Sequence, residues 1–523
     1  MGYMLRSRFP GTFAATTPDK PAVIRPATGE QITYAGLEAR SAQFAHVLTD
    51  DWGLRPGDTV AVVSDNTLEM VEIYWAALRT GLYIAAINHH LTADESSYII
   101  GDCGARALVV SAPVADHVDL SPDAHPGVEH RVVFGGTLDG FADYRQLLAG
   151  KPTDPPADQP RGHDFLYSSG TTGRPKGVRV DPPEGQIDEL PDVYTPVFSF
   201  LYAFDADSVY LCPAPLYHAA PLRFCGVVNS VGGTVVLMDR FDAEESLRLI
   251  QEYRVTHSQW VPTMFVRMLK LPEETRERYD LSSMTHAIHA AAPCPPEVKR
   301  RMIEWWGPVI HEYYSATEGM GITFINSQEA LERPGSVGRD GLKGIAHICD
   351  EEGRELPIGE IGTIYWQQDE GTFSYHGDPD KTASVFHPEH PNWSTFGDVG
   401  YLDEDRFLYL TDRKAFTIIS GGVNIYPQEI ENALALHPAV DDVAVIGIPD
   451  EEMGERVHAV VVPAPERAGD PGLADEILGS LRGHVSDFKI PRAVDFVDEL
   501  PRTPTGKLVK RRILDRYTTG ATA

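Results

Sequence analysis

Hydrophobic residues in the first 112 positions fall into short runs separated by stretches with helical spacing. Ala22–Ile24, Gln31–Thr33 and Thr59–Val63 predict strands, and Tyr83–Ala86 and Ala107–Val110 predict buried strands. Between them, Tyr34–Leu48 and Leu68–Leu78 repeat apolar residues at the helical period. Strands that alternate with helices are typical of a parallel sheet covered by helices. We therefore predict an α/β fold for this part of the chain.

Two later stretches interrupt this rhythm. Residues 120 to 160 are rich in Pro, Asp and Gly and predict a loop-rich crossing with one short helix near Tyr144–Leu148. His257–Phe265 predicts a strand followed by a turn. Asp65, Asn66 and Asn88 follow predicted strands and are interpreted as turn or cap residues.

The last third of the chain changes pattern. Short strands between glycines begin near Arg333. After them come predicted helices at Gln428–Leu436 and Leu473–Val485 and predicted strands at Val440–Ile448 and Val457–Val462. The Lys510-Arg511-Arg512 cluster is interpreted as a solvated helix face. This pattern predicts a β-rich portion followed by a small α+β domain.

Composition narrows the possible functions. With 523 residues the chain should hold more than one domain, and its formal net charge of −31 argues against binding nucleic acid. Its five cysteines form no metal-ligand or disulfide spacing, which favours a reducing, cytoplasmic location. The sequence contains no run of 18 apolar residues, so it predicts no integral membrane segment. Peripheral membrane contact and a homodimer stay open.

The stretch Tyr167–Val178 reads Tyr-Ser-Ser-Gly-Thr-Thr-Gly-Arg-Pro-Lys-Gly-Val and carries the strongest chemical signal. Glycines let backbone N–H groups approach an anion, hydroxyls add donors, and Lys176 adds a positive charge. Pro175 stands where a Walker A loop has its second glycine, so this is not that motif. The stretch resembles the phosphate loop of the adenylate-forming superfamily, which includes acyl-CoA synthetases, aryl-CoA ligases, luciferases and adenylation domains.

Further motifs occur in the order that this superfamily has them. The resemblance implies that Lys507, Thr317, Glu318 and His218 are catalytic and that Glu318 holds Mg²⁺. It implies that ATP and CoA contact a larger set: Ser168, Ser169, Gly170, Thr171, Thr172, Gly173, Lys176, Ala291, Ala292, Pro293, Tyr314, Asp398, Arg413, Gly421 and Gly422. In this set Tyr314 would stack on adenine, Asp398 would accept hydrogen bonds from the ribose, and Gly421–Gly422 would contact CoA.

The same resemblance predicts the domain organisation. A large N-terminal domain (1–412) of mostly parallel sheets with a β-rich portion would connect through a hinge (413–416) to a small mobile α+β domain (417–523). The hinge pivot, commonly Asp or Lys, would be Ala415 or Lys414. Two alanines, Ala290 and Ala291, stand where the superfamily usually has glycines, and their methyl groups would reshape the pocket.

These features predict an AMP-forming acyl-CoA synthetase that activates a hydrophobic carboxylic acid, medium- or long-chain or bulky and cyclic. The expected acid pocket comprises His218, Cys225, Trp260, Met264, Ala290 and Ser315. The small residues Ala290 and Ala291 neither fill the deep end of this pocket nor offer a charge for an α-amino group, which argues against an amino acid. Two alternatives stay open: an adenylating enzyme that loads a carrier protein, and a non-catalytic nucleotide sensor, against which the intact Lys176, Glu318, Asp398 and Lys507 argue.

Overall fold

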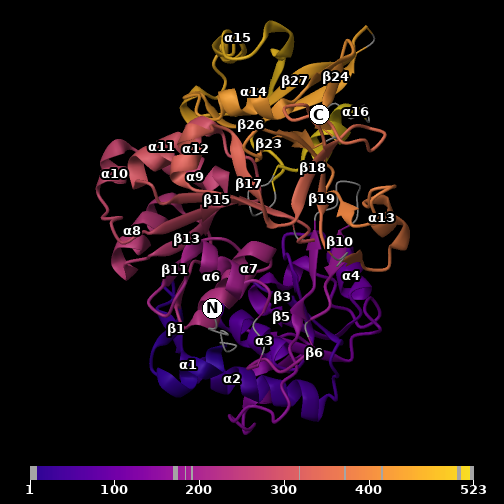
Figure 1. Cartoon of the computed structure of the whole chain (residues 1–523). Helices are drawn as coiled ribbons and strands as arrows, with labels where there is room; N and C mark the ends of the chain where they lie inside the picture. Colours follow the sequence, from indigo (N-terminus) through magenta and orange to yellow (C-terminus); the bar gives the residue numbers. More distant parts are fainter. Residues whose placement is uncertain are drawn as a thin grey trace. The chain divides into compact units, whose positions relative to one another are not determined.

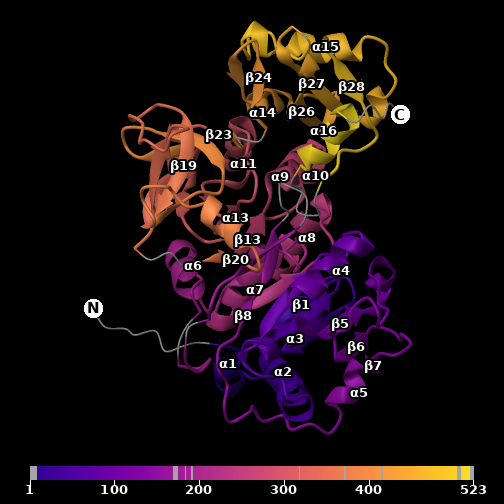
Figure 2. The same cartoon turned by 90° about the vertical axis from the view of Figure 1, so that its right-hand side faces the viewer.

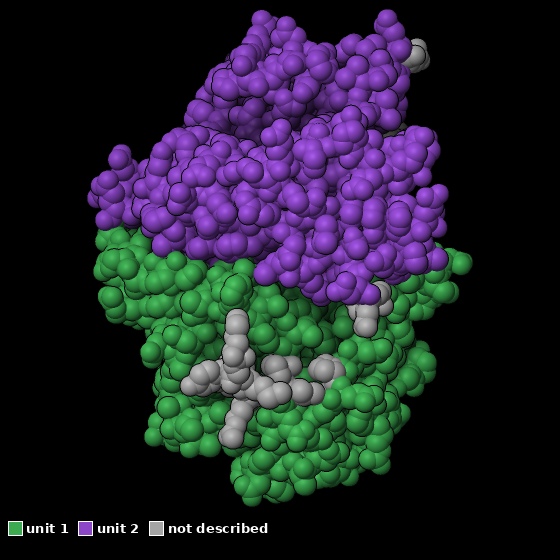
Figure 3. All heavy atoms as spheres, in the orientation of Figure 1, with its two compact units in different colours: residues 1–259, 278–286, 372–382 green, residues 260–277, 287–371, 383–523 purple. Residues whose placement is uncertain are grey.

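The computed structural model describes residues 9–168, 175–182, 184–189, 192–316, 318–369, 373–413, 416–450, 452–502 and 508–518. The chain divides into two compact units, which Figure 3 distinguishes by colour. Unit 1 comprises residues 1–259, 278–286 and 372–382, and unit 2 comprises 260–277, 287–371 and 383–523. Each unit is described separately.

Unit 1 is α/β, as its hydrophobic pattern predicts. Its helices are α1 (Pro10–Thr16), α2 (Tyr34–His46), α3 (Leu68–Leu78), α4 (Ala93–Asp102), α5 (Tyr144–Leu148), α6 (Thr195–Tyr202), α7 (Ala219–Val231) and α8 (Ala243–Tyr253). Its strands are β1 (Pro21–Arg25), β2 (Glu30–Thr33), β3 (Thr59–Val63), β4 (Tyr83–Ile87), β5 (Ala105–Ser111), β6 (His130–Phe134), β7 (Ala142–Asp143), β8 (His163–Asp164), β9 (Leu166–Ser168), β10 (Lys176–Arg179), β11 (Val209–Cys212), β12 (Thr234–Leu237), β13 (His257–Trp260) and β20 (Ser374–Tyr375). Helix α13 (Pro379–Ser384) leads from unit 1 into unit 2.

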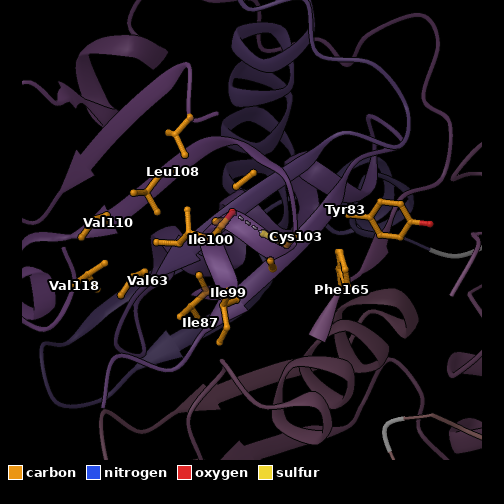
Figure 4. Packing of buried hydrophobic residues seen from close by; sticks show 14 of the residues in the cluster. Val63, Tyr83, Ile87, Ile99, Ile100, Cys103, Leu108, Val110, Val118 and Phe165 are labelled. Carbon is orange, nitrogen blue, oxygen red and sulfur yellow. Dashed lines mark hydrogen bonds between the residues drawn. The ribbon is translucent and has the colours of Figure 1, made fainter. Parts of the chain in front are cut away.

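A parallel sheet with strand order β7-β6-β5-β3-β4-β8 organises the first part of unit 1. Every residue of β3 and β4 is buried, as expected for parallel strands covered on both faces. Helix α4 packs Ile99, Ile100 and Cys103 on one face of this sheet, and Figure 4 shows them among sheet side chains that include Val63 and Val110. A Thr92–Glu95 capping box starts α4 and fixes where this face begins.

Two further groups of strands complete unit 1. Strand β12 lies between β1 and β11, parallel to both, and β11 also pairs with β13. Strand β10 pairs antiparallel with β9 and β20. One sequence prediction was wrong here: the stretch 120–160 contains strand β6, which pairs in parallel with β5.

Unit 2 has a body (260–277, 287–369 and 383–413) and a C-terminal lobe (416–518). The helices of the body are α9 (Pro262–Leu269), α10 (Glu273–Glu277), α11 (Pro296–Trp306) and α12 (Ser327–Glu332). Its strands are β14 (His286–His289), β15 (Ile310–Tyr314), β16 (Ile322–Ile325), β17 (Ser336–Lys343), β18 (Ile345–Cys349), β19 (Gly362–Gln367), β21 (Trp393–Ser394), β22 (Asp398–Leu402) and β23 (Phe407–Arg413). They follow the order β14-β15-β16-β17-β23-β22-β19-β18, and only the β14–β15 pair among these described strands is parallel.

The C-terminal lobe is the predicted α+β domain. It contains β24 (Ile418–Ser420), β25 (Val423–Ile425), α14 (Pro427–Leu434), β26 (Val440–Asp450), β27 (Gly454–Pro463), α15 (Leu473–Ser480), β28 (Val494–Phe496) and α16 (Lys510–Thr518). Side chains alternate along β26, so Val443 and Val445 face α14 and α15 while Ala444 and Ile446 face α16. Figures 1 and 2 show the lobe in orange and yellow.

Candidate functional site

A cavity of about 300 Å³ lies in unit 2, where several strand ends of the body meet the C-terminal lobe. Ala291–Pro293 follow β14. Tyr314 is the last residue of β15 and Ser315 follows it, and Asp398 is the first residue of β22. The cavity is therefore lined by six of the residues singled out in the sequence: Ala291, Ala292, Pro293, Tyr314, Ser315 and Asp398. Motifs more than 100 residues apart in the chain meet at this one cavity.

A short hydrogen bond joins two of these residues. The Tyr314 hydroxyl donates to Asp398 Oδ2 at 2.6 Å. The centre of the Tyr314 ring lies 6.1 Å from that of Trp366 and 6.2 Å from that of Phe396, so it packs in an aromatic group. Asp398 is buried and its carboxylate only accepts hydrogen bonds, so it can take a further donor from a bound molecule.

The turn after β14 carries backbone strain. Ala291 has φ = 74°, a left-handed conformation that favours glycine, and its side chain is exposed. Ala290 is buried, and its N–H donates to the Trp260 carbonyl at 3.3 Å. Ala291 thus lines the cavity, whereas Ala290 packs into the core.

A buried charge cluster lies at the edge of the cavity and was not foreseen from the sequence. Glu312 lines the cavity, and its carboxylate binds Lys299 of α11, which also donates to the Ser336 carbonyl at 3.3 Å. His289 Nδ1 lies 3.8 Å from Glu312 Oε1. Burial raises the pKa of Glu312, which Lys299 opposes, and burial holds the pKa of His289 well below its ordinary value, so its ring is neutral.

The C-terminal lobe supplies a polar wall. Its lining residues include Gln428, Glu431 and Asn432 of α14, Val440–Val443 of β26, and Arg502, Leu508 and Lys510, beside the apolar Phe416 and Ala435. Lys510 Nζ lies 2.9 Å from Glu431 Oε1, and Arg502 Nε donates to Asp442 at 2.5 Å. The interpretation of Lys510 as a solvated residue was wrong: it is buried because Glu431 neutralises it. Arg511 and Arg512 are exposed, as expected.

In unit 1, β9 and β10 form the stem of the predicted phosphate loop. Their antiparallel pairing places Ser168 opposite Lys176. Lys176 Nζ lies 5.5 Å from the centre of the Tyr375 ring. Ser169, Gly170, Thr171, Thr172 and Gly173 lie outside the described residues, so their predicted phosphate contacts stay a prediction.

His218 immediately precedes α7, and a buried asparagine holds the turn that contains it. Asn66 Nδ2 donates to the carbonyls of Ala214 (3.1 Å) and Met238 (2.8 Å), and its Oδ1 accepts from the Leu216 N–H at 2.8 Å. Interpreting Asn66 as an ordinary turn residue therefore understated its role. Its position three residues after the end of the buried strand β3 was the available signal.

The other predicted pocket residues are core residues in this structure. Cys225 lies on α7 beside Cys212, and burial raises the pKa of its thiol well above the ordinary value. Trp260 and Met264 are buried in unit 2. Trp260, Met264 and Ala290 do not line the 300 Å³ cavity as the described residues define it. The stretch predicted as a turn after Trp260 is helix α9, whose Pro262 stands in its first turn.

The remaining candidates fall in several places. Gly421 (φ = 58°) and Gly422 (φ = 80°) form the two-residue turn between β24 and β25, a geometry that requires left-handed residues. The Arg413 backbone pairs with Asp398 across β22 and β23. Thr317, Lys507 and both hinge candidates, Lys414 and Ala415, lie outside the described residues, as does the side chain of Arg413.

Glu318 is compatible with a Mg²⁺ site of the kind that relies on substrate phosphates. Mg²⁺ is usually held by one or two carboxylates together with phosphates and water. In the part of the chain that the structure describes, no three His, Cys, Asp or Glu side chains gather to form a metal cage. A single carboxylate such as Glu318 thus fits an ion that arrives with a nucleotide.

No helix among the described residues is both long enough and apolar enough to cross a membrane.

Comparison with known proteins identifies the family of the motifs. Residues 12–375 match the family model described as AMP-binding enzyme, and residues 429–507 match the AMP-binding enzyme C-terminal domain. The chain is 31% identical to the fatty acid–[acyl-carrier-protein] ligase ScoC of Streptomyces coeruleorubidus, covering 96% of this chain and 94% of ScoC. It is also 31% identical to the long-chain-fatty-acid–CoA ligase FadD13 of Mycobacterium tuberculosis, covering 99% and 98%. The ATP-bound crystal structure of MatB from Rhodopseudomonas palustris superposes with a TM-score of 0.80 at 30% identity, covering 98% of this chain and 100% of that one.

Proposed function

The chain belongs to the AMP-binding enzyme family, and from this premise we propose that it joins a hydrophobic carboxylic acid to the thiol of CoA. It is an AMP-forming acid–thiol ligase that uses ATP, Mg²⁺ and CoA. The observation that carries the proposal is the cavity in which Tyr314, Asp398 and the Ala291–Pro293 turn meet. A flat aromatic ring, a fixed acceptor and a narrow backbone turn suit a nucleoside.

In the first step, an oxygen of the acid attacks the α-phosphorus of ATP. The bond to the β-phosphate breaks, and acyl-AMP and pyrophosphate form. We assign Lys176 and the loop that precedes it to the β- and γ-phosphates, and Glu318 to Mg²⁺, which screens the phosphate charge. Lys507 would bridge the acid and the nucleotide. These groups act by positioning and by neutralising charge.

At the nucleoside end, Asp398 would accept hydrogen bonds from the ribose hydroxyls while Tyr314 stacks on adenine. The Tyr314–Asp398 hydrogen bond holds both groups ready, because it fixes the carboxylate before the nucleotide arrives. Glu312 lines the same cavity and offers an acceptor for the amino group of adenine.

In the second step, the thiol sulfur of CoA attacks the acyl carbonyl and AMP leaves. Lys507 has no role in this attack, so we propose that the small domain (417–523) turns about the 413–416 hinge and brings Gly421–Gly422 to the site. Two steps with different needs explain why a small domain follows the large one (1–412). Arg413 would stay near the ribose.

The acid itself is proposed from the candidate pocket and the relatives. The pocket of His218, Cys225, Trp260, Met264, Ala290 and Ser315 stays a prediction. Small residues at Ala290 and Ala291 offer no charge for an α-amino group, and FadD13 is named for long-chain fatty acids. A medium- or long-chain acid, or a bulky cyclic one, fits these features. Because ScoC is named for an acyl carrier protein, a carrier protein is the second candidate acceptor.

The test is pyrophosphate release with a panel of acids, each with and without CoA, beside Lys507→Ala. We expect release with decanoate that exceeds release with acetate, a thioester product only with CoA, and strongly reduced adenylation by Lys507→Ala. Acyl-AMP that accumulates regardless of CoA would instead favour the carrier protein. No release with any acid would support a nucleotide sensor and contradict the proposal.

Location and assembly complete the proposal. The five cysteines are free and buried, which supports a reducing cytoplasm. A homodimer stays a prediction that sedimentation of the purified chain would test.

A further inference from the structure

Lys270 directly follows α9 in the body and contacts the C-terminal lobe. Its Nζ donates to the carbonyl oxygens of Val440 and Asp441, at 2.9 Å each, and lies 3.6 Å from Asp441 Oδ1. The lysine side chain is 29% exposed. Residues 170 positions apart are thus joined by a charged donor and two backbone acceptors. Figures 1 and 2 show α9 and β26.

The receiving backbone is irregular, which explains why it accepts a side chain. The pairing of β26 with β27 shifts register between Val440 and Asp442: Val440 faces Pro463 and Asp442 faces Val462. Asp441 has no partner residue in β27, as in a β-bulge, where the extra residue leaves the ladder. Lys270 supplies hydrogen bonds to this stretch of backbone.

Helix α9 and strand β26 also line the cavity proposed for the nucleotide. Pro262, Thr263, Val266 and Arg267 of α9 line it from the body, and residues 440–443 line it from the lobe. Arg502 and Leu508, which pair in an isolated bridge, line the same cavity. The contact made by Lys270 therefore fixes the orientation in which body and lobe jointly enclose the site of Tyr314 and Asp398.

We propose that Lys270 is a positioning residue that holds the C-terminal lobe against α9 while the acyl-adenylate forms and releases it for the thiol step. This inference rests on the proposed function. The charged pairs of the lobe wall, Glu431–Lys510 and Asp442–Arg502, lie within the lobe and survive its movement. When the lobe moves, the hydrogen bonds from Lys270 to Val440 and Asp441 break, and its partly exposed ammonium is hydrated again. This contact, which we call the latch, is therefore reversible.

The experiment compares two half-reactions in the full chain. ATP–pyrophosphate exchange reports acyl-adenylate formation, and conversion of added acyl-adenylate with CoA reports the thiol step. We expect Lys270→Ala to slow exchange by roughly tenfold or more, the effect of losing one hydrogen bond from a charged group. The thiol step should be unchanged or faster. Lys270→Arg, which keeps the positive donors, should recover most of the exchange rate.

Lys489→Ala is the matched control, because Lys489 forms a comparable ion pair with Glu429 at 2.6 Å wholly within the lobe. It should leave the ratio of the two rates at the wild-type value. Equal loss of both half-reactions in Lys270→Ala, or no change in either, overturns the latch. A wild-type protein that catalyses neither half-reaction with any acid contradicts the proposed function instead, so the two failures are distinguishable. Thermal unfolding of all variants identifies any general loss of folding.

Discussion

The body wall and the lobe wall of the unit 2 cavity differ in how their charged groups are held. The body wall carries a buried ion pair, Lys299–Glu312, whose side chains are 5% and 3% exposed. It also carries the Tyr314–Asp398 hydrogen bond. The lobe wall is more polar, yet its charges pair with one another: Glu431 with Lys510 and Asp442 with Arg502.

This difference suits a fixed wall and a removable one, which the proposed movement of the lobe requires. Groups on the body wall are held by distant strands and α11, so they stay in place whatever the lobe does. The lobe wall satisfies its own charges, and moving it away leaves no buried charge uncompensated. A ligase with two successive reactions at one site needs both kinds of wall.

The sharpest test of the fixed wall is Lys299→Met. It leaves the Glu312 carboxylate buried without its cation, and we expect a loss of about 3–5 kcal/mol in the free energy of unfolding of unit 2. Urea denaturation of the full chain measures it. Lys510→Met on the removable wall should cost less, because Glu431 also accepts the Val445 N–H at 2.7 Å.

Two outcomes of this experiment decide the comparison. Equal losses in the free energy of unfolding for Lys299→Met and Lys510→Met would contradict the difference between the two walls. The double variant Lys299→Met with Glu312→Gln should recover much of the loss, because it removes the unpaired charge together with its partner.

Lys507→Ala tests the catalytic role proposed for the lobe. We expect ATP–pyrophosphate exchange to fall by roughly 10²–10³-fold, the usual effect of removing one group that stabilises transition-state charge. Conversion of added acyl-adenylate with CoA should change little. Arg511→Ala is the control: Arg511 is exposed on α16 and pairs with Asp515 at 3.0 Å, so its loss should leave both rates near wild type. Equal loss of both half-reactions in Lys507→Ala would refute a role confined to adenylation.

Local patterns predicted much of the fold. The runs of β3 and β4 and the helix Leu68–Leu78 were right because burial on one or both faces leaves a clear period. Strand β6 was missed since its five residues stand between stretches rich in Pro, Asp and Gly. Helix α9 was predicted as a turn although Pro262 marks its first turn, because the stretch that was interpreted, His257–Phe265, ends after the first turn of the helix.

Motifs at the site could be recognised in the sequence, whereas pairings between distant segments could not. Motifs with several unusual residues, such as the Tyr314 and Asp398 segments, meet in one cavity, while their predicted contacts with the nucleotide stay a prediction. Pairings between distant segments were not foreseen: Lys299 with Glu312, Lys510 with Glu431, and Lys270 with residues 440–441. Single charged residues in a sequence do not reveal whether a partner from another element neutralises them.

A smaller effect should follow from His289 beside the fixed wall. Its folded pKa lies below the unfolded value of about 6.5, so the unfolded chain binds more protons between those two values. Stability should therefore be complete above pH 6.5 and decline as the pH falls below it, by at most roughly 1.4 kcal/mol per pH unit. His289→Leu should flatten this decline in urea denaturation between pH 7 and 5. An unchanged slope would mean that His289 is not the group that titrates. Glu312, whose pKa is raised, acts with the opposite sign and remains in both proteins.

The smallest expected effect is on the stability contributed by the turn at Ala291 in the body, where a residue with a side chain takes a left-handed conformation. The lobe has glycines at its comparable turn. Gly421 and Gly422 take left-handed conformations at no steric cost, whereas Ala291 takes one with a methyl group, at a cost of roughly 1–2 kcal/mol. Ala291→Gly removes this strain but gives the unfolded chain more freedom, worth about 0.5–1 kcal/mol, so the net gain should stay within about 1 kcal/mol.

Ala290→Gly is the matched control, because Ala290 is the buried neighbour and is not in the left-handed region. It should destabilise unit 2 by about 1 kcal/mol, so two adjacent Ala→Gly changes should have opposite signs in the same urea experiment. Equal destabilisation by both would mean that the Ala291 conformation carries no strain. If the signs differ and Ala291→Gly also raises the KM for ATP, the methyl group serves the fixed wall by holding the turn in shape before the nucleotide binds.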